Sequence, residues 1–434
     1  MKFSNSRIDA REWIGLTTII VHASALYGFL GMIAGIPNIR LVSVFSIALL
    51  IFYVILRINT FIRIIRYAPI FLFISFIWFI PVFLNYVQVA LGITTIDRFV
   101  YWAGFLSLSG LLAISSSIIG FVSTNKFIRS IFLMILFIVF AQFIVNILDY
   151  SFVRKVLIFT NSVRSGSLSQ GRLTGFFPHP NQAAISISIF CFIIVYHQKA
   201  SLIFGSIAIA ACLLMVVLTG SRTSLILMLV VATLVMTREA FRSSGGLLKS
   251  IILVSMAVPI LLLSFEILSL TINVQFLESM TKRAQSIFFI FSEASTDDVS
   301  VNLRSQAIRD YAHIIGNNPL FGIGLDGVSN QILNGRLQTT SQNAWIQWAT
   351  EFGIVYSLIG IVTFFIIYSR ANRTRNFNSS SMSLKFYIVL LIISSFSIDD
   401  IFNIRPVTIV MGLLLGQALR TNIRLAAGAC DNSN

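Results

Sequence analysis

The chain has 434 residues, of which 56% are hydrophobic and only 11% are charged. A soluble domain carries roughly 25% charged residues, so this composition excludes an ordinary soluble fold, which needs more polar surface. The net charge of +15 comes without a basic stripe, a zinc-finger spacing or an RNA-binding motif, which excludes a dedicated nucleic-acid-binding protein.

Apolar runs recur along the whole chain and predict an all-α polytopic membrane protein with about twelve transmembrane helices. The runs lie near residues 13–35, 41–57, 68–86, 99–122, 128–148, 182–197, 201–219, 223–237, 250–271, 347–369, 384–398 and 404–419. Lys2, Arg7 and Arg11 precede the first run, and no small-residue cleavage site follows it. We therefore expect an uncleaved first span.

The loops between the runs predict the orientation in the membrane. Lys and Arg concentrate in the short loops at 57–66, 238–249 and 370–385. Because basic loops stay inside, this distribution predicts an inner-membrane protein with both chain ends in the cytoplasm.

The predicted order of parts alternates helices with two polar outer segments. Residues 1–148 hold helices one to five, 149–181 a periplasmic loop, 182–271 helices six to nine, 272–346 a large periplasmic loop, and 347–434 the last three helices with a cytoplasmic tail. Long polar segments are often functional, so we expect the chemistry on the outer face. Within the large loop, the periodic stretch from Arg304 to Ile315 predicts a helix that stops at Gly316-Asn317-Asn318-Pro319.

Three arginines lie where a predicted span meets the outer face: Arg172, Arg222 in the turn Thr219–Ser224, and Arg304. An arginine at the hydrocarbon edge is costly unless it reaches the headgroups or binds an anion. A guanidinium group binds phosphate oxygens through two parallel hydrogen bonds, and a lipid diphosphate presents such oxygens at this depth. The alternative is that each arginine only reaches the lipid headgroups.

A polar and aromatic stretch enters the span after the large loop. Gln342 and Asn343 share one face of a predicted helix, with Glu351 about two turns further on. Amides and a carboxylate bind sugar hydroxyls, and Trp345 and Trp348 offer flat surfaces for sugar rings. The alternative is structural, because Asn caps helices and Trp gathers at bilayer interfaces.

In this order the segments resemble the O-antigen ligase and O-antigen polymerase superfamily of membrane glycan transferases. The resembling segments are Arg172 with Thr174-Gly175 and His179-Pro180-Asn181, then Ser221-Arg222-Thr223, then Arg304 with Asn318-Pro319-Leu320-Phe321-Gly322-Ile323-Gly324, and last Gln342-Asn343, nine residues, Gly353, two residues and Tyr356.

One position departs from the ligase pattern, which has His followed by Asn, Ser or Gln, then nine residues, Gly, two residues, and Thr or Tyr. Gln342 stands at the histidine position, and a glutamine accepts no proton near neutral pH. The departure favours the polymerase branch, which includes exopolysaccharide polymerases.

The resemblance implies an enzyme of the bacterial inner membrane that transfers a glycan from undecaprenyl pyrophosphate to a lipid-linked repeat unit on the periplasmic side. It implies a lipid-linked oligosaccharide donor, an acceptor glycolipid, a chain-length regulator and a flippase as partners. It implies no metal or nucleotide cofactor and no nucleic acid. The sequence likewise contains no Walker A loop or zinc triplet.

The resemblance also suggests roles for individual residues. Arg172, Arg222 and Arg304 are the candidates to hold the charge that develops on the departing pyrophosphate. Glu351 is the first candidate to accept the proton of the acceptor hydroxyl, followed by His313, His179 and Asp326. The remaining substrate-binding candidates are His179, Asn181, His313, Gln342, Asn343 and Trp345.

Two alternatives remain open from the sequence. The first is an O-antigen ligase that transfers the glycan to lipid A core without the histidine. The second is a secondary transporter, which places charged or broken-helix sites near mid-membrane and often has two related halves. Glu266 is the one acidic residue that we expect to be buried in a span, since Glu351 lies near the outer start of its run. The sequence also contains no internal repeat, so the transporter is the weaker alternative.

Overall fold

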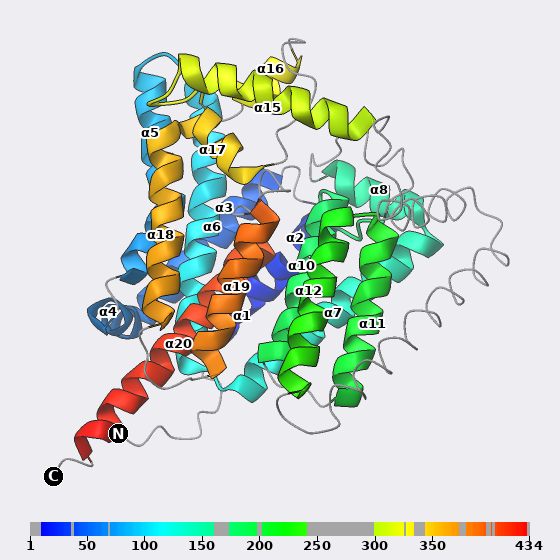
Figure 1. Ribbon diagram of the computed structural model, residues 1–434, viewed down its shortest axis with the longest axis vertical. Coiled ribbons are helices and arrows are strands. Elements are labelled where there is room, and N and C mark those ends of the chain that lie inside the picture. The colour runs from blue at the N-terminus through cyan, green and yellow to red at the C-terminus, as the bar shows by residue number, and fades with distance from the viewer. Residues whose placement is uncertain are drawn as a thin grey trace. The chain divides into compact units, whose positions relative to one another are not determined.

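The computed structural model describes residues 10–35, 39–67, 70–159, 173–197, 202–240, 299–324, 327–333, 343–372, 379–395, 401 and 404–431. The elements within these ranges are all helices, which confirms the predicted all-α class (Figure 1). Apart from the short π-helix η1 (Ile193–His197), they are α1 (Ala10–Ala23), α2 (Tyr27–Ile33), α3 (Ile39–Leu56), α4 (Ile58–Tyr67), α5 (Ile70–Ala90), α6 (Ile96–Val122), α7 (Asn125–Leu148), α8 (Tyr150–Phe159), α10 (Pro180–Phe192), α11 (Leu202–Thr219), α12 (Arg222–Ala240), α15 (Val299–Asn317), α16 (Gly327–Leu333), α17 (Ala344–Phe352), α18 (Ile354–Asn372), α19 (Ser379–Ser395) and α20 (Arg405–Asp431).

Among the described residues, the structure does not confirm the predicted number of membrane spans. Three stretches are long and apolar enough to cross a bilayer: Trp102–Val122, Phe127–Leu148 and Pro180–His197. The count rises to five if each of two bent helix pairs forms one span. The predicted twelve spans are therefore not confirmed, because several apolar helices are short or broken. The predicted run at 250–271 lies outside the described residues.

Three predicted segments have different boundaries in the structure. The run at 13–35 consists of α1 and α2, which meet at an angle of 102°. The loop predicted at 57–66 is mostly the helix α4, which bends 74° away from α3. The run at 347–369 is broken at Gly353, between α17 and α18. By contrast, α15 confirms the helix predicted from Arg304 and ends at Asn317, inside the predicted stop.

The chain divides into two compact units. Unit 1 comprises Met1–His22, Arg40–Ser123 and Asp297–Asn434, and unit 2 comprises Ala23–Ile39 and Thr124–Thr296. Unit 2 is built around α10, whose side chains are almost all buried against α7, α11 and α12.

The centre of unit 1 is the close contact between α6 and α20. A Cβ atom added to Gly416 would lie 2.1 Å from the carbonyl oxygen of Ser117, and one added to Gly412 would lie 2.4 Å from that of Ala113. Small residues four positions apart allow two helix backbones to approach this closely, as in membrane helix pairs. The contact keeps α6 and α20 side by side as the frame to which the other helices of unit 1 attach.

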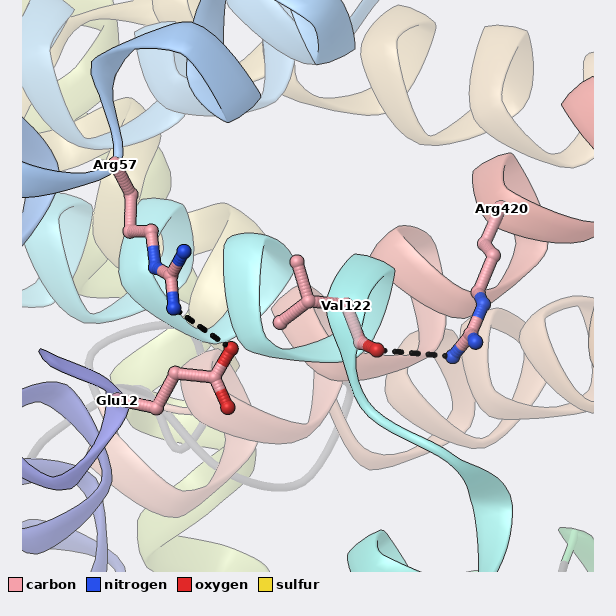
Figure 2. Close-up of polar contacts among 4 residues, drawn as sticks. All are labelled: Glu12, Arg57, Val122 and Arg420. Carbon is pink, nitrogen blue, oxygen red and sulfur yellow. Dashed lines mark hydrogen bonds and ion pairs between the residues drawn. The ribbon is translucent and has the colours of Figure 1, made fainter. Parts of the chain in front are cut away.

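Two arginines make fixed contacts at one end of unit 1 (Figure 2). Arg57, between α3 and α4, forms an ion pair with Glu12 of α1, with Nη2 and Oε1 3.1 Å apart. Arg420 of α20 donates to the carbonyl oxygens of Val122, at 3.2 Å, and Ser123. A cation at a helix C-terminus supplies donors to the last carbonyls, so Arg420 caps α6. The topology predicted from the basic loops makes this the cytoplasmic end.

Candidate functional site

The candidate site residues of unit 1 gather where the large outer segment meets α17. Helix α15 lies across the end of the unit 1 helices at which α17 begins (Figure 1). Ala307 and Tyr311 of α15 form a buried cluster with Val328 of α16, and Ile346 of α17 packs against it. The large outer segment is therefore held on α17 by an apolar contact.

A backbone crossing, which we call the outer junction, joins residues 318–324 to residues 350–354. Its hydrogen bonds are Ile323 N to Thr350 O at 2.8 Å, Gly324 N to Glu351 O at 3.1 Å, and Ile354 N to Pro319 O at 2.8 Å. The last carbonyls of a helix have no partner within the helix, and the loop supplies donors to those of α17. The segments singled out by the resemblance, 318–324 and 351–356, are therefore in direct contact.

Two glycines make this crossing sterically feasible. Gly353 has φ of 91°, and a Cβ atom there would lie 2.0 Å from Leu320 O. Gly322 has φ of 66°, and its Cβ atom would lie 2.4 Å from Thr350 O. Both positions need a left-handed backbone and leave no room for a side chain, which is a physical reason for glycine at position 353 in the ligase pattern.

Gln88 of α5 holds the outer junction from one side. Its side chain is fully buried, and its Nε2 atom donates to Phe321 O at 2.5 Å and to Glu351 O at 2.7 Å. One amide thus connects both segments of the outer junction to α5. The backbone of Glu351 is thereby fixed by Gln88 and by Gly324.

Tyr356 has an equally specific structural role. Its hydroxyl group donates to Ile77 O of α5 at 2.5 Å. In a regular helix this carbonyl would accept from the N–H four residues later, but position 81 is a proline, which has none. Tyr356 replaces the missing donor, which gives its hydroxyl group a structural role in this chain.

The side chains at the start of α17 are engaged within the protein. Asn343 caps the helix, because its Oδ1 atom accepts from Trp345 N at 3.0 Å and from Ile346 N at 3.2 Å. Trp345 Nε1 donates to Ser395 Oγ at 2.7 Å, and the Trp348 ring is buried beside Tyr356. Capping and packing thus occupy three of the residues considered for sugar binding, and a contact with sugar stays a prediction.

Glu351 is half-buried at the end of α17. Its Oε1 atom accepts from Gln347 Nε2 at 2.5 Å, across one helical turn. The opposite atom of that amide, Gln347 Oε1, is buried and has no hydrogen-bond partner among the described residues. An ionised carboxylate can only accept hydrogen bonds, and the amide of Gln347 supplies one donor to that of Glu351.

The other unit 1 candidates are only partly described. His313 lies exposed on α15, with its Nδ1 atom 3.3 Å from Asn317 Nδ2. Arg304 belongs to α15, but its side chain lies outside the described residues, as do Gln342 and Asp326 altogether. Their roles stay predictions.

In unit 2, α7 holds the segment that follows Arg172. Asn146 Oδ1 accepts from Thr174 N at 3.3 Å and from Gly175 N at 3.2 Å. One turn earlier, Gln142 Oε1 accepts from Phe176 N at 3.1 Å. These two amides of α7 fix the loop before α10.

The same loop continues directly into α10. His179 caps this helix, with its Nδ1 atom accepting from Asn181 N at 3.1 Å, and Pro180 begins the helix. This bond places the proton of His179, when the ring is neutral, on the other nitrogen.

The structure also brings the segments of two candidate arginines together. Leu173, the residue after Arg172, donates from its backbone N–H to Leu218 O at 3.2 Å, just before the turn that contains Arg222. Arg222 is the first residue of α12, and Ser221 Oγ next to it bonds to Ser224 Oγ at 3.1 Å. The side chain of Arg222 and all of Arg172 lie outside the described residues. The roles of Arg172 and Arg222 therefore stay predictions.

A comparison with models of known protein families covers part of the chain. Residues 207–356 match the family described as O-antigen ligase. Residues 207–356 therefore resemble an O-antigen ligase domain. The matched part begins in α11, contains Arg222 and the outer junction, and ends at Tyr356. A comparison with curated proteins gives no match.

The match confirms the resemblance to the O-antigen ligase and polymerase superfamily. It supports a membrane enzyme that processes glycans in the manner of these ligases and polymerases. Within the matched residues, Gly353 and Tyr356 occupy the two pattern positions for which the structure gives a packing reason.

The predicted site residues did not include the amides of Gln88, which holds the outer junction in unit 1, and of Gln142 and Asn146, which hold the loop before α10 in unit 2. Gln142 and Asn146 lie inside an apolar run, and Gln88 lies just after another. Polar side chains within apolar spans are costly and usually have a partner, so they were a usable signal.

Proposed function

We propose that this protein is a polysaccharide polymerase. It transfers a glycan from undecaprenyl pyrophosphate to a lipid-linked repeat unit on the periplasmic side of the inner membrane. The observation that carries this choice is Gln342, which stands at the histidine position of a ligase pattern otherwise present through Gly353 and Tyr356. An enzyme without that histidine needs another group to assist the acceptor hydroxyl.

The reaction breaks the bond between the sugar and the pyrophosphate and forms one between the sugar and the acceptor hydroxyl. Undecaprenyl pyrophosphate leaves with the electron pair and needs cations for its growing charge. Arg172, Arg222 and Arg304 are proposed to supply them, each worth about 2–4 kcal/mol of transition-state stabilisation.

Glu351 is proposed to take the proton of the acceptor hydroxyl. In support, its carboxylate is bonded to Gln347, and its backbone is held by Gln88 and Gly324. A base fixed at both backbone and side chain loses little orientational freedom when the acceptor binds.

A ligase that transfers the glycan to lipid A core is the second candidate. The observation in its favour is the description of the matched family, O-antigen ligase. In that case Gln342 would hold the acceptor by hydrogen bonds, and Glu351 would still receive its proton.

The test is the polymer profile of a deletion strain. The strain is complemented with the wild type, Arg222→Ala, Arg304→Ala or Glu351→Gln, and protein levels are matched. Arg309→Ala is the control, because Arg309 is an exposed arginine on the same helix as Arg304. A polymerase predicts single repeat units in the deletion strain, and long chains restored by the wild type and by Arg309→Ala alone.

Two other outcomes would change the proposal. Long polymer that accumulates on its lipid carrier and never reaches the core would identify a ligase. Unchanged glycans in the deletion strain would refute both enzymes and make transport the leading alternative. Gln342→His adds a further test, since a polymerase gains no ligation to the core from that substitution alone.

A further inference from the structure

We propose that α4 is an interfacial helix that binds the headgroups of anionic phospholipids through Arg63 and Arg66. The proposal concerns the end of unit 1 opposite the outer junction and is independent of the proposed function. It begins from the bend between α3 and α4, at which the chain turns by 74°. A helix that follows an apolar helix at such an angle lies across the direction of the span.

The residues of α4 divide into distinct faces. Ile64 is fully buried against the protein, and α4 packs on α5, α6 and α20. Ile58 and Ile62, one turn apart, are 44% and 49% exposed. Because residues four apart share one side of a helix, these two form a single apolar stripe next to the buried side.

A polar face adjoins the apolar stripe. Asn59, Arg63 and Arg66 are exposed and follow one another at helical spacing. An exposed apolar stripe beside a basic face is the arrangement of helices that lie in the membrane interface, with apolar side chains among the acyl chains and basic ones among the headgroups.

Neighbouring contacts indicate that α4 lies at the polar boundary of unit 1. Arg57, at the bend, is engaged with Glu12, and Arg420 caps the end of α6 (Figure 2). Charged side chains and helix ends mark the polar boundary of a bundle, and α4 packs on both α6 and α20 beside them. Arg57 and Arg420 are therefore committed to the protein, whereas Arg63 and Arg66 are exposed.

The positive charge of this face identifies the occupant. The cytoplasmic leaflet of a bilayer is anionic, and the predicted topology places 57–66 on that side. Two guanidinium groups about one turn apart fit phosphate oxygens of neighbouring headgroups. A neutral lipid offers the same acyl chains to Ile58 and Ile62 but lacks the net negative charge.

Binding of short-chain lipids to the purified full chain in detergent tests the proposal. The probes are dioctanoyl phosphatidylglycerol, dioctanoyl phosphatidylcholine and inorganic phosphate, and the readout is the Kd from thermophoresis. We expect phosphatidylglycerol to bind more tightly than phosphatidylcholine. Arg63→Gln and Arg66→Gln should each weaken phosphatidylglycerol binding about fivefold, and the double variant about 25-fold. Phosphatidylcholine binding should not change.

Two further variants separate a site from a general charge effect. Arg309→Gln removes one exposed positive charge from α15 and should leave both lipid affinities within about twofold, since it lies far outside the range of a bound headgroup. Arg63→Lys with Arg66→Lys should retain the preference, which also shows that the helix tolerates substitution.

Three outcomes would overturn the proposal. One is a double glutamine variant that keeps the wild-type preference while its thermal unfolding is unchanged. Another is an equal loss in Arg309→Gln, which would reveal unspecific attraction. The third is complete displacement of phosphatidylglycerol by inorganic phosphate at the same concentration as the lipid. That result would indicate a phosphate site and not a lipid-binding surface.

Discussion

Replacing Tyr356 with phenylalanine removes only the hydroxyl group that donates to Ile77 O at 2.5 Å. The ring remains, so its packing against Trp348 and Phe352 is kept. Pro81 provides no N–H to this carbonyl, which is left without its helical partner. A buried carbonyl without a donor costs about 1–3 kcal/mol, and we expect Tyr356→Phe to lower the free energy of unfolding by that amount.

A second substitution tests the cause of this loss. Pro81→Ala introduces an N–H at the position from which a helix normally donates to Ile77 O. In that background Tyr356→Phe should cost less than about 0.5 kcal/mol, because the carbonyl keeps a partner. The interaction energy of the double-mutant cycle should therefore be about 1–2 kcal/mol.

Tyr387→Phe is the matched control. The Tyr387 hydroxyl also donates to a backbone carbonyl, that of Val407, at 2.6 Å. Val407 lies inside α20 with no proline four residues later, so its carbonyl keeps a helical donor. We expect a cost of at most about 1 kcal/mol, and no change in that cost when Pro81→Ala is added.

The measurement is the free energy of unfolding of the detergent-solubilised full chain, titrated with SDS and followed by tryptophan fluorescence. Equal costs of Tyr356→Phe with proline and with alanine at position 81 would refute the reasoning. So would a Tyr387→Phe variant that loses as much stability as Tyr356→Phe.

Three further predictions concern the outer junction and the start of α8. Gly353→Ala should lower the free energy of unfolding by about 2–6 kcal/mol, because its Cβ atom would lie 2.0 Å from Leu320 O at a φ of 91°. Gly316→Ala is the control and should be neutral, because its Cβ atom would meet no atom within 4 Å. Thermal unfolding in detergent compares the two variants, and equal midpoints would contradict the close crossing. Gln88→Met should lower the free energy of unfolding by about 1–3 kcal/mol, because Phe321 O loses its donor. Asn85→Leu is the control and should not destabilise the protein, since both amide atoms of Asn85 are buried without a hydrogen-bond partner among the described residues. The SDS unfolding titration compares the two variants. A larger loss of unfolding free energy in Asn85→Leu than in Gln88→Met would contradict this prediction. The Asp149 carboxylate accepts from Phe152 N and Ser151 Oγ at the start of α8, and these bonds lower its pKa. Its stabilisation of α8 is present above the ordinary aspartate pKa and is lost as the pH falls through the lowered value. Hydrogen exchange of residues 150–159 should therefore accelerate in acid beyond the intrinsic rate change, and Asp149→Ala should show the faster exchange already at neutral pH.

The sequence alone determined the class of the protein and several local elements. Apolar runs bury themselves as helices whatever their neighbours are, so the all-α class followed from composition and run length. Helix α15 and its end at Asn317 followed from local periodicity and from the glycine and proline after it. The family resemblance followed from the order of short motifs, and the match at 207–356 confirms it.

The tertiary structure decided where the helices break and why the motif residues are needed. The breaks after α1, after α3 and at Gly353 divide apolar stretches that look continuous in the sequence. At Gly353, the carbonyl groups of Thr350 and Glu351 accept from Ile323 N and Gly324 N, which come from a distant segment. Tyr356 and Ile77 are 279 positions apart, and Gln88 and Glu351 are 263 apart. No local propensity connects residues at such separations. The packing of α5 against α17 and α18 brings each donor to its carbonyl group. The structural roles of Pro81, Gly353 and Tyr356 all depend on this packing.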